Sequence, residues 1–183
     1  MLFEELPKSD HPLIILRTLV EEDLPVWYGY LSMLEVFEHT SWNLKSFAEL
    51  APYVHEPEPR TAASRLRLAV ALRSTGQLVG TVGFHTVSAE NRSAEIAYDL
   101  SPIIWGKGIA THVCQLVVGW AHSSAAVLRV QATVLESNVR SEAVLRRCGF
   151  AREGLLRSYR MVRGAPGNFY MYSHVVPRLH AVT

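Results

Sequence analysis

The sequence predicts an α+β fold in which a mixed, mostly antiparallel twisted sheet contains a central βαβ unit and carries flanking helices. Residues 66–72 alternate apolar and polar side chains, and a turn at 74–77 joins them to a strand-like run at 78–85, which indicates an antiparallel hairpin. A third strand-like run, at 93–100, is separated by a helical stretch from a fourth at 127–134. A helix between two strands favours parallel pairing, so this part of the chain predicts the βαβ unit.

The segment before the hairpin predicts one strand followed by helical pieces. Residues 14–19 form a short β-like run, and residues 21–25 combine acidic side chains with a proline, as is typical of the first turn of a helix. The remainder, 26–59, mixes aromatic residues, helix-like pieces and prolines. We expect Asn43 to cap a helix that continues through Leu50.

Two helices are predicted in the second half of the chain. The first runs to about residue 123 and carries an apolar stripe at helical spacing. The second is capped by Ser137 or Asn138 and ends at Cys148, with Gly149 just beyond its last turn. The stripe of the first helix consists of Ile109, Val113, Leu116, Val117 and Trp120. Closing strands are expected at 150–156 and 169–176.

Composition narrows the functional classes. The 183 residues favour one domain, 1–183, and the 49% hydrophobic and 19% charged residues are ordinary for a soluble globular protein. No apolar run reaches the length of about 18 residues that suggests a membrane span. The net charge of +1 gives no general attraction to nucleic acid, and the first residues do not resemble a signal peptide. We therefore expect a cytoplasmic protein with neither nucleic acid nor a membrane as partner.

The cysteines and histidines do not predict a metal site. Cys114 and Cys148 fall in helix-like segments, where free cysteines usually behave as small buried apolar residues, so we expect no disulfide. His112 and Cys114 lie two residues apart on a predicted helix and therefore point away from each other. The chain also has no His-Glu-x-x-His run, so no metal is expected.

The run WGKGIAT, residues 105–111, has the properties of a phosphate-binding turn. Its two glycines allow the backbone to approach a ligand closely, and the free N–H groups of the following helix point towards it. A Walker P-loop is excluded because Gly108, not Ser or Thr, follows Lys107, and a dinucleotide fingerprint is excluded because Thr111 stands where it needs glycine. A plain strand-to-helix turn remains the alternative.

Three separated pieces of the sequence together resemble the GNAT superfamily of N-acetyltransferases, and in particular its RimJ/RimL-type branch. The pieces are 91–98 followed by Ser101-Pro102 and WGKGIAT; Asn138-x-x-Ser141 with Val144-Leu145 and Cys148-Gly149-Phe150; and Glu153-Gly154 with Leu156-Arg157, Arg163-Gly164 and 170–173. The first matches the family's Arg/Gln-x-x-Gly-x-Gly/Ala motif, except that Trp105 occupies the Arg/Gln position, as is common in this branch. The resemblance covers about residues 14–176 and implies the GNAT fold.

This resemblance implies that acetyl-CoA is the co-substrate. Its pyrophosphate would bind the backbone N–H groups of the turn, and its pantetheine arm would lie in a cleft where 97–100 and 130–134 diverge. An N–H near Asp99 or Leu100 would polarise the thioester carbonyl. The implied coenzyme-binding residues are Tyr98, Asp99, Leu100, Trp105, Gly106, Lys107, Gly108, Ile109, Ala110, Thr111, Asn138 and Ser141. Helix capping is the alternative role of Asn138 and Ser141, and a solvated side chain that of Lys107.

Acetyl transfer to an amine needs a base for the amine and a proton donor for the departing thiolate. We expect Glu95 to be the base, since partial burial would raise its pKa towards neutrality; an exposed carboxylate paired with Arg92 or another basic residue is the alternative. His85 and His39 are alternative bases. Many GNAT enzymes use a tyrosine as the acid where this chain has Leu145, which leaves Ser141 as the donor.

The acceptor is predicted only as a primary amine, on a small molecule or at a protein N-terminus, in a monomer or homodimer. The resemblance places its groove between residues 27–42 and the loop 160–169, with Phe37, His39, Trp42, His85 and Tyr170 as substrate-binding residues. Relatives often have an acidic residue near Asn168, so its neutral side chain disfavours a cationic acceptor. A non-catalytic acetyl-CoA sensor and a protein-interaction module are the alternatives to an enzyme.

Overall fold

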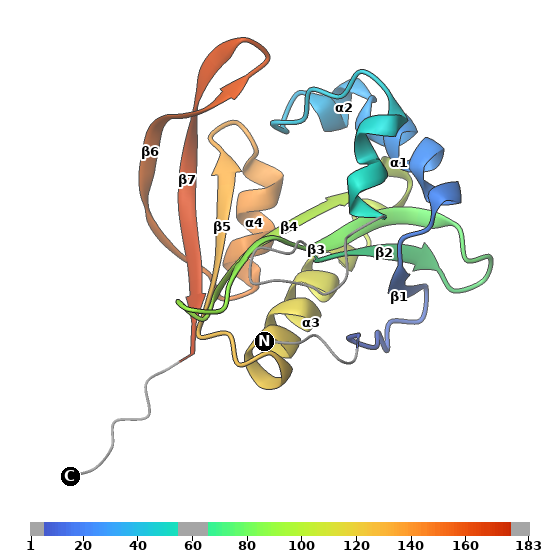
Figure 1. Cartoon of the computed structure of the whole chain (residues 1–183), viewed down its shortest axis with the longest axis horizontal. Helices are drawn as coiled ribbons and strands as arrows, with labels where there is room; N and C mark the ends of the chain where they lie inside the picture. The colour runs from blue at the N-terminus through green and yellow to red at the C-terminus, as the bar shows by residue number, and fades with distance from the viewer. Residues whose placement is uncertain (1–5, 55–65, 177–183) are drawn as a thin grey trace.

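The computed structural model describes residues 6–54 and 66–176, which form one seven-stranded sheet with helices on both faces (Figure 1). The strand order is β1-β2-β3-β4-β5-β7-β6, and β4 and β5 are parallel while all other neighbours are antiparallel. The predicted mixed sheet and βαβ unit are therefore confirmed. The strands are β1 (Ile14–Thr18), β2 (Leu66–Leu72), β3 (Leu78–Ser88), β4 (Ser93–Leu100), β5 (Arg129–Leu135), β6 (Ala151–Val162) and β7 (Ala165–Val175).

The helices flank this sheet in two groups. Short helices precede β2: η1 (Glu21–Asp23), α1 (Leu24–Leu31), α2 (Leu34–Phe37) and η2 (Phe47–Tyr53). The second group comprises η3 (Pro102–Ile104), α3 (Ile109–Ser124) and α4 (Val139–Arg147). Among the described residues, no helix is long and apolar enough to span a membrane.

The sheet opens between its two parallel strands. β4 and β5 pair only from Ser93 with Arg129 to Glu95 with Gln131, whereas β5 pairs with β7 over its whole length. Figure 1 shows β5 and β7 diverging from β1–β4 beyond this short contact. The predicted divergence is confirmed, although Val130, which was expected in the open part, still pairs with Ala94.

Two hydrophobic clusters cover the two faces of the sheet. One contains Val113 and Val117 of α3, and the other contains Trp27 of α1. Residues 66–72 were expected to form a half-buried strand, but Arg67 and Ala69 are buried as well as their apolar neighbours. The expectation was wrong because the α1–η2 layer covers the face of β2 that the alternation assigned to solvent.

Two local expectations also differ from the structure. The helix expected from Asn43 to Leu50 is instead the 3-10 helix η2, which Ser46 precedes in a reciprocal capping box. The expected loop at 160–169 is mostly strand, because the sharp turn at Arg163 and Gly164, with φ of 51° and 83°, joins β6 directly to β7.

The helix ends around the open strands follow the sequence closely. Asn138 Oδ1 accepts the Ser141 N–H at a distance of 3.0 Å and so caps α4, and Gly149 has a φ of 81° beyond its end. Cys114 and Cys148 are both free and buried. The backbone around the opening is thus fixed by local signals.

Candidate active site

A cavity of about 440 Å³ occupies the opening between β4 and β5. Its walls come from both strands, from α4, from the segment after α2 and from β6. Seven of the residues predicted for the site line it: His39, Trp42, His85, Tyr98, Asp99, Asn138 and Ser141. These seven residues, which come from separate pieces of the sequence, therefore meet at one cavity, whereas Glu95, Leu100, Phe37, Tyr170 and residues 105–111 are not among its lining residues.

The glycine turn directly precedes α3, and its residues are not among those that line the cavity. Gly106 and Gly108 have φ of 75° and 74°, and a Cβ at either position would meet nothing within 4 Å. The first backbone bond of the helix joins the His112 N–H to Gly108 O, and no side chain caps the helix. The N–H groups of residues 109–111 are therefore free to bind an anion, because no side chain caps this end of the helix.

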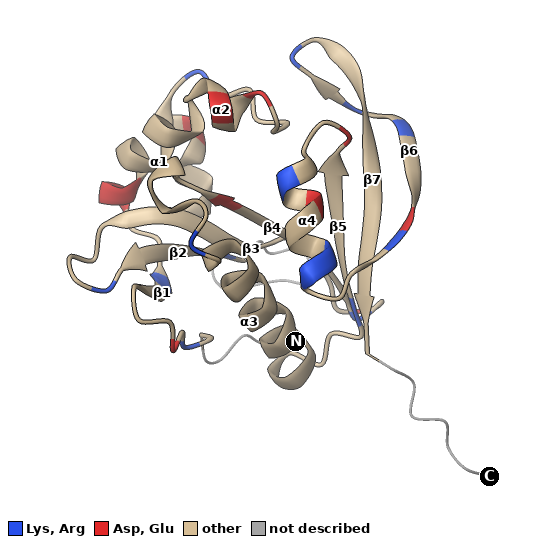
Figure 2. Ribbon diagram, turned by 180° about the vertical axis from the view of Figure 1, so that it is seen from behind, with Lys and Arg blue, Asp and Glu red and all other residues tan. Residues whose placement is uncertain are grey.

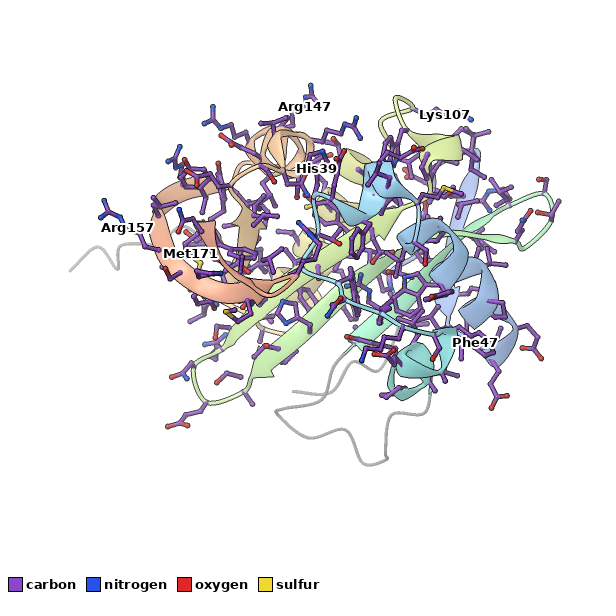
Figure 3. The ribbon with its side chains drawn as sticks, turned by 90° about the horizontal axis from the view of Figure 1, so that it is seen from above. His39, Phe47, Lys107, Arg147, Arg157 and Met171 are labelled. Atoms are coloured by element: carbon purple, nitrogen blue, oxygen red, sulfur yellow. The ribbon has the colours of Figure 1, made fainter. Side chains whose placement is uncertain are left out.

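Trp105 fixes the turn and stacks with a basic residue that the sequence reasoning missed. Its indole N–H donates to Leu100 O at 2.9 Å, and the Arg140 guanidinium of α4 lies 4.5 Å from its ring centroid. Figure 2 shows basic residues over α4 and β6, and Figure 3 shows Arg147 of α4 and Lys107 of the turn along the same edge. The Lys107 ammonium is exposed and donates to Ile103 O at 3.3 Å.

A tyrosine and a serine meet across the opening. The Tyr98 hydroxyl of β4 lies 2.9 Å from Ser141 Oγ and 3.2 Å from Ser141 O of α4. Burial raises the pKa of the Tyr98 phenol well above its usual value, so the phenol stays protonated and can donate. Leu145 is fully buried. The phenol beside α4 in this opening is therefore that of Tyr98 from β4.

Glu95 and Tyr98 are three residues apart on β4, so their side chains point to opposite faces of the strand. Glu95 Oε1 accepts the Thr133 hydroxyl at 2.7 Å and lies 3.2 Å from both His85 Nε2 and Arg160 Nη2. Thr133, His85 and Arg160 are among the residues that line the cavity. Glu95 is not among them, so it lies behind its three partners. The alternative of a carboxylate paired with a basic residue holds in part: the partner is Arg160, which the sequence did not indicate, and Glu95 is buried rather than exposed.

The environment of Glu95 lowers its pKa, contrary to our expectation. Burial alone would raise the pKa, but hydrogen bonds from His85 and Thr133 and the charges of His85 and Arg160 lower it to about 2. Glu95 is thus an ionised carboxylate with its oxygens occupied.

Asp99 is also fully engaged within the protein. Its Oδ1 accepts the Trp27 indole N–H at 2.9 Å and the Tyr30 hydroxyl at 2.5 Å. Its Oδ2 pairs with the Arg67 guanidinium and accepts the Thr81 hydroxyl at 2.9 Å. The Asp99 side chain therefore joins α1 to three strands. Any coenzyme contact at this position falls to the backbone.

The segment after α2 contributes residues 39–42 to the cavity lining. The Asn138 amide donates to His39 O at 3.0 Å, and the Arg163 guanidinium donates to Phe37 O, Glu38 O and Thr40 O at 2.9–3.1 Å. We call residues 37–42, which comprise the last residue of α2 and the segment after it, the strap. Figure 3 shows His39 of the strap beside α4.

Two predicted substrate residues do not line the cavity. The Phe37 ring lies 5.0 Å from the Arg163 guanidinium, and the Tyr170 hydroxyl donates to Glu136 at 3.2 Å. The neutral side chain of Asn168 was expected to disfavour a cationic substrate. In the structure, Asn168 accepts a hydrogen bond from the Ser158 N–H at 3.0 Å and donates one to Glu136 at 3.2 Å. It therefore stabilises an irregularity in β6.

A family model described as an acetyltransferase (GNAT) domain matches residues 14–151. The chain belongs to the GNAT acetyltransferase family. Its relatives confirm that it is an N-acetyltransferase, as predicted: it is 31% identical over 167 residues to the uncharacterized N-acetyltransferase YoaA of Bacillus subtilis (strain 168), covering 90% of this chain and 94% of that protein.

Two further GNAT proteins illustrate the range of the family. The chain is 26% identical over 100 residues to a ribosomal-protein-serine acetyltransferase of Escherichia coli (strain K12), covering 55% of this chain and 56% of that protein. The crystal structure of the Microcin C7 self immunity acetyltransferase MccE, in complex with acetyl-CoA and AMP, superposes with a TM-score of 0.79 at 21% identity. That match covers 91% of this chain and 94% of MccE and confirms the GNAT fold.

Proposed function

We propose that this GNAT enzyme is of the RimJ/RimL type and transfers the acetyl group of acetyl-CoA directly to a primary amine while both substrates are bound. The observation that carries the proposal is the cavity between the diverging β4 and β5. It has hydroxyl donors on the α4 side and the Glu95 cluster, with its imidazole and guanidinium, on the other. This arrangement separates a site for a leaving thiolate from a site for an incoming amine.

The coenzyme would bind mainly to backbone groups. Its pyrophosphate would accept the N–H groups of residues 106–111, assisted by the positive end of the α3 dipole and by Arg140 above Trp105. Its pantetheine arm would lie between the unpaired parts of β4 and β5. Tyr98, Asp99, Asn138 and Ser141 border that space, although Asn138 and Asp99 are also occupied within the protein.

One backbone N–H is well placed to polarise the thioester carbonyl. N–H groups alternate between the two edges of a strand, and the Ser101 N–H donates to Val79 O of the neighbouring strand β3. The Leu100 N–H therefore faces the opening, whereas the Asp99 N–H faces β3. One such donor contributes roughly 3 kcal/mol to stabilising an oxyanion.

The neutral amine nitrogen attacks the carbonyl carbon, the C–S bond breaks, and the proton that the new amide nitrogen loses passes to solvent. The thiolate takes a hydrogen bond from Ser141, which the Tyr98 phenol supports, and is protonated from solvent as CoA leaves. Glu95, being ionised, would stabilise the positive charge that develops on the attacking amine and would hold His85 and Arg160 in place.

The acceptor class in this proposal is a small-molecule amine or a protein N-terminus, and no metal takes part. We further propose that residues 1–183 act as a single cytoplasmic domain, as a monomer or homodimer.

A thiol-release assay with acetyl-CoA tests the proposal. The acceptor panel contains amino acids, spermidine, an aminoglycoside and hexapeptides with N-terminal serine or alanine. We expect release of CoA with at least one acceptor and an acetylated product by mass spectrometry. No turnover with any acceptor, together with no effect of saturating acetyl-CoA on the melting temperature, would overturn the proposal.

A further inference from the structure

Arg160 presents an accessible guanidinium at the wall of the cavity. It lines the cavity from β6, and its side chain is 33% exposed. Arg67, the other arginine among the described lining residues, has a side chain that is only 4% exposed and pairs with Asp99. Of these two arginines, Arg160 is therefore the one that a bound molecule can reach.

The ion pair between Arg160 and Glu95 has its positive end towards the cavity. Arg160 is a lining residue, whereas the Glu95 side chain is 7% exposed and is not one. The Glu95 carboxylate already accepts hydrogen bonds from Thr133 and Arg160 through Oε1 and from Gln131 through Oε2. A molecule in the cavity thus meets the guanidinium and not the carboxylate behind it.

Most of the hydrogen-bond donors of Arg160 remain unused. A guanidinium carries five N–H donors, and within the described part of the chain Arg160 makes a single hydrogen bond, from Nη2 to Glu95 Oε1 at 3.2 Å. The planar group matches the geometry of a carboxylate, which can accept two parallel N–H bonds. Arg160 can therefore bind a carboxylate without giving up Glu95.

The orientation of Arg160 is fixed before any ligand binds. Ser158 has a φ of 50°, and its N–H donates to Asn168 at 3.0 Å, where the pairing of β6 with β7 shifts in register. The guanidinium lies 4.9 Å from the ring centroid of Tyr159 and 5.6 Å from that of Phe169. A side chain held in this way loses little conformational entropy when it binds a ligand.

The cavity offers no free carboxylate to a cationic substrate. Asp99 is the one acidic residue among the described lining residues, and both of its oxygens accept hydrogen bonds from protein donors. A polyamine carries ammonium groups besides the amine that reacts, and each of them loses free energy if it leaves water without an acceptor. The wall therefore favours an acceptor with a negative charge over one with additional positive charge.

Arg160 lies on the side of the cavity that the proposed function gives to the amine. It belongs to the cluster around Glu95, whereas Ser141 and Tyr98 border the proposed thiolate site. The turn 105–111, proposed to bind the pyrophosphate, is not among the lining residues. An anionic group bound at Arg160 would thus belong to the acceptor and not to the coenzyme.

We propose that the acceptor is a small primary amine that also carries a carboxylate, and that Arg160 binds this carboxylate; the inference rests on the proposed function. The bound carboxylate would hold the neutral amine nitrogen beside the thioester carbonyl. The cavity of about 440 Å³ must also hold the end of the pantetheine arm, which favours an acceptor of amino-acid size. Arg160 is thus the residue that determines acceptor specificity.

The test compares acceptors that share an amine and differ in the carboxylate. Glycine is paired with glycinamide and β-alanine with β-alaninamide. The kcat/KM values are expressed per concentration of unprotonated amine, because the amide lowers the pKa of the amine. We expect wild-type protein to prefer the carboxylate in at least one pair by about 10- to 100-fold, as for a charge-assisted hydrogen bond.

Variants of Arg160 separate recognition of the carboxylate from other roles of this residue. Arg160→Gln should reduce the preference to less than threefold, mainly through KM for the acceptor, and should keep the melting-temperature increase caused by acetyl-CoA. The ratio within a pair cancels any loss that acts through Glu95 on both acceptors. Arg160→Lys should keep part of the preference, since it retains the charge but not the planar group. Arg157→Gln is the matched control, because Arg157 is exposed on the same strand and points away from the molecule (Figure 3).

The possible results distinguish this inference from the proposed function. Equal kcat/KM values within both pairs for wild-type protein, or an unchanged preference in Arg160→Gln, overturn the inference. A higher kcat/KM for spermidine or for a hexapeptide than for any amino acid also overturns it, while the proposed function stands. No turnover with any acceptor overturns the inference, and if acetyl-CoA also leaves the melting temperature unchanged, the proposed function fails as well.

Discussion

Replacing Asp99 by alanine should destabilise the fold strongly. Asp99 is 7% exposed and accepts from Trp27, Tyr30, Arg67 and Thr81, so that both oxygens are used. The substitution leaves the Arg67 guanidinium, whose side chain is 4% exposed, without its counter-ion. Such a loss costs about 3–5 kcal/mol. That is a large fraction of a typical domain stability of about 5–15 kcal/mol.

Urea unfolding followed by tryptophan fluorescence measures this effect, because Trp27 lies in the network. Glu153→Ala is the matched control: Glu153 accepts two bonds from Arg129 and one from Ser173, but its side chain is 41% exposed. An exposed pair of this kind contributes about 0–1 kcal/mol. A loss below 1.5 kcal/mol for Asp99→Ala, or one no larger than the control's, would refute the view that burial gives this network its strength.

Three further outcomes are expected. Gly108→Glu puts a side chain at a φ of 74° and a negative charge at the pyrophosphate site, so it should abolish the increase in melting temperature caused by acetyl-CoA, which corresponds to about 2.7 kcal/mol at 100 times Kd. Gly119→Glu, on an exposed part of the same helix, should keep the increase, and equal shifts in both variants would contradict the proposed binding mode. Ser141→Ala should lower kcat about 10²-fold with little change in KM for acetyl-CoA; a kcat within threefold of wild type would exclude Ser141 as the donor. Burial and the charge of His122 lower the pKa of His174, so the stability that His174 contributes is complete above about pH 6.5 and is lost as the pH falls through its folded-state pKa. His174→Gln should therefore flatten the decrease in unfolding free energy between pH 7 and 5 in urea titrations, and an unchanged slope would argue against this linkage.

The backbone geometry of the proposed coenzyme site could be predicted because its signals are local. The turn 105–111 needs glycine where φ is positive, and Asn138 caps α4 through a bond to a residue three positions away. Such contacts depend on neighbours in the sequence, so a short motif is enough to specify them.

The proposed amine side of the cavity could not be predicted, because it depends on contacts between distant segments. Ser158 in β6 has a φ of 50°, and Asn168 holds it there, which interrupts the strand pairing just before Arg160. The irregularity brings Arg160 to Glu95, 65 residues away in the chain. No spacing in the sequence indicates that pairing.

The sequence by itself determined the strand and helix order, the family, the glycine turn at 105–111 and the capping of α4 by Asn138, since period, capping and turn chemistry are properties of neighbouring residues. The tertiary structure alone decided the state of the ionisable groups. Glu95 is buried among hydrogen-bond donors that keep its carboxylate charged. The carboxylate oxygens of Asp99 accept hydrogen bonds from residues of α1 and β2, and His39 Nδ1 is buried without a hydrogen-bond partner. Proton affinity and hydrogen-bond supply depend on everything within a few ångströms, and only the folded chain defines that neighbourhood.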